Sequence, residues 1–136
     1  MLTQARQAIE DSQNKPLLIA VTILTSLSAS EVAEIGYGQD VATQVKHLAR
    51  LSYECGLDGV VCSAQEANII KSVTAPEFLT VTPGIRLADA TKDDQTRVMT
   101  PEAAVYNGAD YLVIGRPITQ ANDPLVILRG INSLLK

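Results

Sequence analysis

The pattern with the clearest chemical potential is a glycine-arginine pair near the end of the chain. The apolar residues Val113 and Ile114 lead into Gly115, Arg116 and Pro117. Glycine lets an anion approach the backbone amide, and a guanidinium can hold two phosphate oxygens at once. The pair therefore indicates a phosphate site, although an arginine that follows a turn and pairs with a surface acid has the same pattern.

A second arginine follows another apolar run and precedes a long polar stretch. Residues 78–84 lead to Arg86, and residues 87–98 are polar and longer than an ordinary loop between strand and helix. That length favours a loop that covers a ligand. The charged and amide side chains in it are Asp89, Lys92, Asp93, Asp94 and Gln95.

Hydroxyl side chains end a third apolar run, at Thr25 and Ser26. They could hydrogen-bond the edge of a ligand or begin a turn, and the sequence leaves both interpretations open. The single histidine, His47, lies beside Lys46 on the polar side of a helix predicted over residues 40–55. We therefore expect His47 to be exposed to solvent.

Several common catalytic and cofactor-binding patterns are missing from the sequence. It contains no P-loop, no dinucleotide-binding glycine motif, no nucleophile elbow and no His/Cys cluster at metal-ligand spacing. Cys55 and Cys62 have no second pair beside them, so we expect two buried, reduced thiols. The sequence thus predicts neither a metal nor a nucleotide cofactor.

The elements that must position these residues recur as short strands separated by helices. Four apolar runs, 17–24, 59–62, 78–81 and 111–114, hardly alternate with polar residues, which predicts a parallel sheet covered by helices on both faces. No linker divides the chain, so residues 1–136 are predicted to form one domain. The pattern fits either a half barrel or a small doubly wound sheet.

The ends of the helices are marked clearly. Capping boxes are predicted at Ser28 and Ser63, helix starts at Thr100 and Asp123, and left-handed helix ends at Gly56 and Gly108. After each of these two glycines come one apolar residue, then an aspartate, and then a predicted strand. The segments that begin at Gly56 and Gly108 therefore look like one structural unit used twice.

Composition and charge exclude some classes of function. With 46% apolar residues, a formal net charge of -4 and no basic block, the chain is a poor match for a nucleic-acid-binding protein. Its longest apolar stretch is far shorter than the roughly 20 residues that a membrane helix needs. The first residues lack the pattern of an export signal, so we expect a cytoplasmic protein that does not bind membranes.

Five separated segments closely resemble bacterial orotidine 5'-phosphate decarboxylases. They cover residues 17–26, 55–67, 81–86, 99–103 and 111–119, in the family's order. The resemblance implies the carboxyl-terminal half, about strands 5 to 8, of a TIM (β/α)8 barrel. It also implies a lyase of de novo pyrimidine biosynthesis that converts orotidine 5'-monophosphate (OMP) to uridine 5'-monophosphate (UMP) and carbon dioxide without metal or organic cofactor.

The same resemblance assigns five substrate-binding residues, which are Thr25, Arg86, Gln95, Gly115 and Arg116. It makes Arg116 and the Gly115 amide ligands of the phosphate, and it places Arg86 in the same set. Gln95 would fold over phosphate and base. Thr25, with neighbouring Ser26 as the alternative, would contact the substrate, and Pro83 would form part of the wall around the pyrimidine.

One departure from the family pattern is serious. The family's catalytic Lys and Asp side chains include a D-x-K-x-x-D motif from the amino-terminal half of the barrel, and this sequence has none. We therefore expect a substrate-binding half that is inactive alone and that forms a homo-oligomer or pairs with the missing half. The alternatives are a non-catalytic half-barrel assembly module and another sugar-phosphate-binding barrel decarboxylase.

Overall fold

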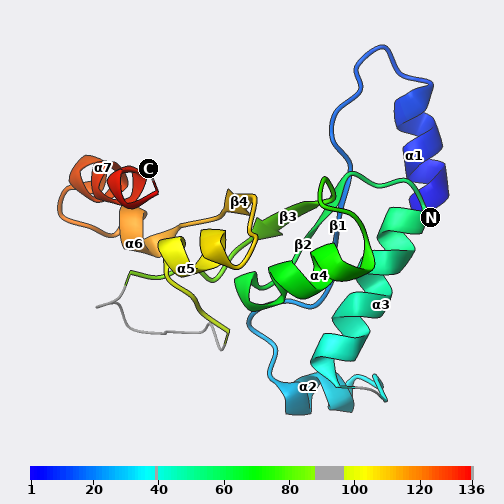
Figure 1. The fold of residues 1–136 in the computed structure, drawn as a ribbon, viewed down its shortest axis with the longest axis horizontal. Coiled ribbons are helices and arrows are strands. Elements are labelled where there is room, and N and C mark those ends of the chain that lie inside the picture. Colours follow the sequence, from blue (N-terminus) through cyan, green and yellow to red (C-terminus); the bar gives the residue numbers. More distant parts are fainter. Residues whose placement is uncertain (39, 88–96, 136) are drawn as a thin grey trace.

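A computed structural model describes residues 1–38, 40–87 and 97–135 (Figure 1). The helices are α1 (Leu2–Glu10), α2 (Ala29–Glu34), α3 (Val41–Glu54), α4 (Ala67–Val73), α5 (Pro101–Tyr106), α6 (Arg116–Thr119) and α7 (Pro124–Leu134), with a 3-10 turn, η1, at Ala64–Glu66. The strands are β1 (Ile19–Val21), β2 (Gly59–Val61), β3 (Leu79–Thr82) and β4 (Tyr111–Leu112). In these ranges no helix has the length and apolar character needed to cross a bilayer.

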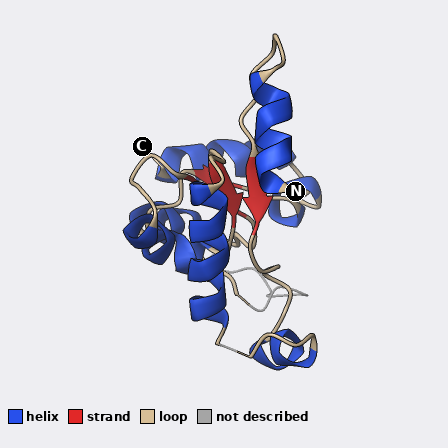
Figure 2. Cartoon of the chain, turned by 90° about the vertical axis from the view of Figure 1, so that its right-hand side faces the viewer, coloured by secondary structure: helices blue, strands red, loops and turns tan. Residues whose placement is uncertain are grey.

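The four strands form one parallel sheet in the order β1-β2-β3-β4, so each strand pairs with the next one along the chain (Figure 1). Figure 2 shows the strands in red with helices beside them. A doubly wound sheet reverses direction at a switch point, whereas a barrel adds its strands in sequence. The order therefore favours the half barrel over the doubly wound sheet, a choice that the pattern of apolar runs had left open.

Within the described ranges, helices cover one face of this sheet and leave the other uncovered. Val60 and Thr80 are register partners on one face and are fully buried, with α3 and α4 packed beside their strands. The other face carries Val21, Val61 and Tyr111, and its outer members Val21 and Tyr111 are 55% and 54% exposed. The prediction of helices on both faces was wrong, because strands lining a barrel interior are also apolar on both faces.

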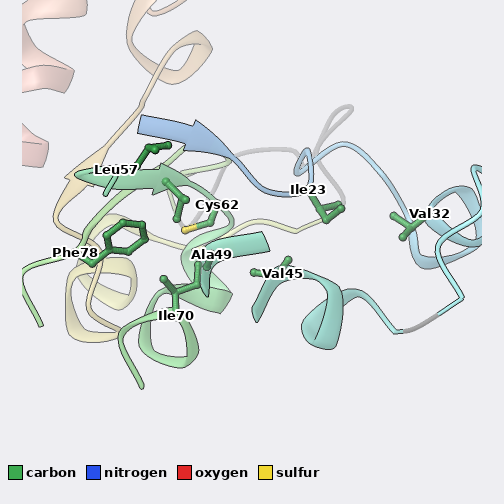
Figure 3. Close-up of a cluster of buried hydrophobic side chains, with 9 residues drawn as sticks. Ile23, Val32, Val45, Ala49, Leu57, Cys62, Ile70 and Phe78 are labelled. Atoms are coloured by element: carbon green, nitrogen blue, oxygen red, sulfur yellow. The ribbon is translucent and has the colours of Figure 1, made fainter. Parts of the chain in front are cut away.

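The main core lies between the sheet and the helices on its covered face. Figure 3 shows Ala49 of α3 beside Ile70 of α4, with Cys62, which follows β2, close by and Val45 further along α3. A smaller cluster, with Ile85 among its members, lies under α5. Gly59 brings β2 close to β3, because a Cβ at this position would lie 2.4 Å from the Leu79 carbonyl oxygen.

Most of the predicted helix ends are confirmed. Ser28 and Ser63 form complete capping boxes, and Thr100 and Asp123 accept hydrogen bonds from the first turns of α5 and α7. Gly56 and Gly108 have φ angles of 78° and 91°, which favour glycine. Of the two free thiols, Cys62 is buried as expected, but Cys55 ends α3 and is only partly buried.

In the two similar segments that begin at Gly56 and Gly108, the aspartate makes the same kind of contact. Asp58 Oδ2 accepts from the Leu18 amide just before β1, at 2.7 Å, and Asp110 Oδ2 accepts from the Thr80 amide in β3, at 2.8 Å. Each carboxylate thus joins the start of its strand to the preceding strand. Each also pairs with a helix cation, Arg6 for Asp58 and Lys71 for Asp110.

We expect Asp110→Asn to lower the free energy of unfolding by about 1–3 kcal/mol at neutral pH. Burial alone would raise the pKa of Asp110, but hydrogen bonds from Lys71 and Thr80 and the Lys71 charge lower it below its ordinary 3.8. The stabilisation is therefore complete well above pH 3.8 and is lost as the pH falls through the lower folded-state pKa. Urea unfolding at several pH values checks this.

The control is Asp11→Asn, because Asp11 is an exposed residue at the end of α1. Its substitution should change the unfolding free energy by less than about 0.5 kcal/mol. Equal effects of the two substitutions, or a loss at Asp110 that does not shrink in acid, would contradict a specific role for the Asp110 carboxylate.

Candidate functional site

The described residues assigned to the substrate all follow strands at one edge of the sheet. Thr25 follows β1, Arg86 follows β3, and Gly115 and Arg116 follow β4. Because the strands are parallel, their carboxyl ends meet at the same edge of the sheet. Both (β/α)8 barrels and open α/β sheets bind their ligands at this edge. Gln95 and the acidic and basic residues 89–94 lie outside the described residues.

A cavity of about 130 Å³ lies at this edge beside β1 and β2. Thr25, its alternative Ser26 and Pro83, the predicted wall of the pyrimidine, line it together, whereas Arg86, Gly115 and Arg116 are not among its lining residues. Thr25 is buried, whereas Ser26 is exposed. Cys62 also lines the cavity. Burial, and to a smaller extent the negative charge of Glu66, raises the pKa of its thiol to about 12, so the thiol stays neutral.

Arg86 is a buried cation with an incompletely satisfied side chain. Its Nη1 donates to the carbonyl oxygen of Ile85 at 2.9 Å, and within the described part of the chain its Nε is buried without a hydrogen-bond partner. The backbone around it is fixed, because the Arg86 amide donates to Met99 and the Met99 amide donates to Gly84. A buried donor of this kind requires an explanation, and a bound anion would supply one.

Gly115 and Arg116 occupy the turn from β4 into α6. Gly115 precedes the helix, and Arg116 is its first residue and is partly buried. A Cβ on Gly115 would meet no described atom within 4 Å, and φ is -99°, so neither packing nor conformation requires glycine here. The open space beside the backbone is what the approach of a phosphate would use.

Sequence reasoning missed a second, partly buried arginine, Arg97. Its guanidinium pairs with Glu66, and the side chains are only 15% and 9% exposed. Burial raises the pKa of Glu66, while the charge of Arg97 and the hydrogen bond from the Ser63 amide oppose that rise. The capping box identified Glu66 as a cap, but no sequence signal paired it with a residue 31 positions away.

His47, by contrast, is exposed on α3, as its place on the polar side of the helix predicted. It lies outside the set of residues that follow the strands at the carboxyl edge. His47 is therefore not part of the candidate site.

Comparisons with known proteins agree with the fold. A family model described as orotidine 5'-phosphate decarboxylase / HUMPS family matches residues 1–131. Orotidine 5'-phosphate decarboxylases from Chromobacterium violaceum and Laribacter hongkongensis are 58% and 56% identical over 132 and 133 residues. These matches cover 97% and 98% of this chain but 53% and 54% of those proteins.

Solved structures give the same result. The crystal structure of orotidine 5'-phosphate decarboxylase from Lactobacillus acidophilus matches all of this chain and 58% of its own, with a TM-score of 0.81 and 33% identity. The chain spans about half the length of the relatives it matches, as the carboxyl-terminal half of a TIM barrel. With a sheet wound in one direction and a family match over nearly every residue, the chain belongs to the orotidine 5'-phosphate decarboxylase / HUMPS family.

Proposed function

We propose that this chain is the substrate- and phosphate-binding half of an orotidine 5'-phosphate decarboxylase, binding OMP and UMP. The observation that carries the proposal is the position of Thr25, Arg86 and Arg116, which follow three strands of one parallel sheet at its carboxyl edge. Arg86 supports it further, since its buried Nε needs an acceptor that the described residues do not supply. Because the nucleotide is a charged metabolite, the proposal includes a cytoplasmic location.

The chemical step needs residues that this chain lacks. In the family that it resembles, an Asp lies against the substrate carboxylate and a Lys stabilises and protonates the developing carbanion. Such preorganised charges usually supply the largest part of catalysis. The sequence has no D-x-K-x-x-D motif, so we expect the chain alone to bind nucleotide without decarboxylating it.

A complementary half barrel is the partner that this proposal requires. The uncovered sheet face is apolar, and in the part of the chain that the structure describes no strand pairs with the outer edges of β1 and β4. A cavity of about 630 Å³ adjoins β1, lined by residues of α1, β1 and α3 such as Leu2, Val21 and Leu48. The missing half would cover this face and supply the Lys and Asp side chains.

A second candidate is a non-catalytic assembly module in which two copies of the chain pair. The same open edges and apolar face favour it, because one copy could cover the face of another. Its mass in light scattering would then rise from 14.5 kDa towards twice that value with concentration, and UMP would have no effect. A monomer that binds UMP would contradict this candidate.

Ligand preference separates the proposed nucleotide site from that of another sugar-phosphate decarboxylase of the barrel superfamily. We expect the chain to bind UMP more tightly than ribose 5-phosphate in isothermal titration calorimetry, because the cavity beside Thr25 and Pro83 would receive the pyrimidine. Gln95→Ala should weaken UMP binding by about tenfold, the loss of one or two hydrogen bonds, and leave ribose 5-phosphate nearly unchanged. If UMP and ribose 5-phosphate bind with equal affinity to the wild-type chain, and also to the Gln95→Ala variant, the sugar-phosphate alternative is favoured.

The control for this measurement is Gln120→Ala. Gln120 is an exposed residue that ends α6, and its side chain has no role in the proposed site. Its substitution should leave both affinities unchanged.

A further inference from the structure

Arg97 joins the segments that follow three neighbouring strands. Its Nη2 donates to the carbonyl oxygens of Ile23 and Leu24, at 3.1 and 2.9 Å, just beyond β1. Its Nη1 pairs with Glu66 Oε1 in the turn beyond β2, and Arg97 itself follows β3 along the chain. One planar guanidinium therefore connects all three segments at the edge of the sheet that holds the candidate site.

The contact with Leu24 falls on a turn that carries the predicted substrate contacts. The Leu24 carbonyl also accepts from the Leu27 amide at 3.0 Å, which closes a four-residue turn with Thr25 and Ser26 at its centre. Both central residues line the 130 Å³ cavity. A group that fixes the Leu24 carbonyl therefore also fixes the position of the two hydroxyl side chains at the cavity.

Glu66 keeps the guanidinium in this orientation. Its Oε2 accepts from the Ser63 amide at 3.1 Å, so the carboxylate is itself held by the capping box of η1. Nearby, Gln65 Nε2 donates to the Val98 carbonyl oxygen at 3.3 Å and ties the same two segments a second time. Because these partners come from different elements, the fork of an arginine can reach them together, whereas the point charge of a lysine cannot.

We propose that Arg97 is a positioning residue for the nucleotide, acting by holding the turn that presents Thr25 and Ser26 to the cavity, with Glu66 as its orienting partner. The inference rests on the proposed function for its effect on ligands. It goes beyond that function by assigning a residue outside the substrate-binding set. Arg97 acts through the Leu24 carbonyl and does not need to touch the ligand.

Hydrogen exchange of the free chain tests the positioning directly. The Leu27 amide should exchange about tenfold faster in Arg97→Met, because its acceptor is no longer fixed. The Leu57 amide, which donates to Ser52 in the core region, should be unchanged. Arg50→Met is the matched control, since Arg50 pairs with Glu54 on the exposed side of α3, and it should change neither amide.

Two results of the exchange experiment would overturn the inference. One is unchanged Leu27 exchange in Arg97→Met, and the other is equal acceleration of Leu27 and Leu57, which indicates general destabilisation. Arg97→Lys provides a further test. Wild-type exchange in the lysine variant would mean that Arg97 only neutralises Glu66, which would also overturn the proposal.

Ligand binding gives the functional consequence. Arg97→Met should weaken UMP about tenfold and inorganic phosphate by less than twofold, because the turn lies at the cavity and not at Gly115 and Arg116. Equal weakening of both ligands, or of neither, would contradict the assignment. If the wild-type chain binds neither ligand, the proposed function fails, while the exchange of Leu27 still decides the role of Arg97.

Discussion

Replacing Arg116 by alanine should weaken binding of UMP to this chain by about 100-fold, the loss expected when a bidentate guanidinium-phosphate contact is removed. Arg116 begins α6 directly after Gly115, whose backbone has open space beside it. No other residue type supplies two parallel donors and a permanent charge in this geometry. Titration calorimetry with UMP in low-salt buffer is the direct measurement.

The matched control is Arg129→Ala. Arg129 is an exposed arginine on α7, so its removal changes the net charge of the chain by the same amount. UMP affinity should fall less than twofold in this variant, because exposed charges are largely screened. Equal losses in both variants would mean that the nucleotide is attracted by overall charge, and the assignment of Arg116 to the phosphate would be wrong.

The effect of Arg116→Ala should also depend on the phosphate of the ligand. Uridine lacks the phosphate, so its affinity should be the same for the wild-type and variant chains. A loss of uridine binding in Arg116→Ala would instead indicate that the substitution disturbs the turn between β4 and α6. Comparing UMP with uridine thus separates a contact with the phosphate from a change of local structure.

Local structure was largely predictable from the sequence, because short-range chemistry determines it. Capping boxes at Ser28 and Ser63 need only the side chains of one turn, and Gly56 and Gly108 adopt the left-handed conformation that few other residues favour. The amphipathic pattern of α3 likewise placed Val45 and Ala49 in the core. These features do not depend on distant parts of the chain.

The uncovered sheet face could not be predicted from the pattern of apolar residues. A strand buried between two helix layers and a strand lining a barrel have similar apolar sequences, since both bury their two faces. Only the strand order and the exposure of Val21 and Tyr111 distinguish them. The resemblance to a family supplied the half barrel where the physical pattern left two folds open.

The candidate site was predictable in part. The apolar runs predicted that Gly115, Arg116 and Thr25 directly follow strands, and these residues do follow β4 and β1. The link between Arg97 and Glu66 did not, because it joins residues far apart in sequence. A partly buried ion pair of this kind depends on tertiary contacts, for which a single sequence has no periodic signal.

The measurement that tests the account most directly is the ultraviolet absorbance of OMP incubated with this chain, alone and with the separately produced amino-terminal half of a full-length relative. We predict no turnover by the chain alone, because its sequence lacks the catalytic Lys and Asp motif. Adding the complementary half should produce turnover, and Arg116→Ala should abolish it. Turnover by the chain alone that Arg116→Ala abolishes would contradict the account, because it would require a working catalytic arrangement within these 136 residues.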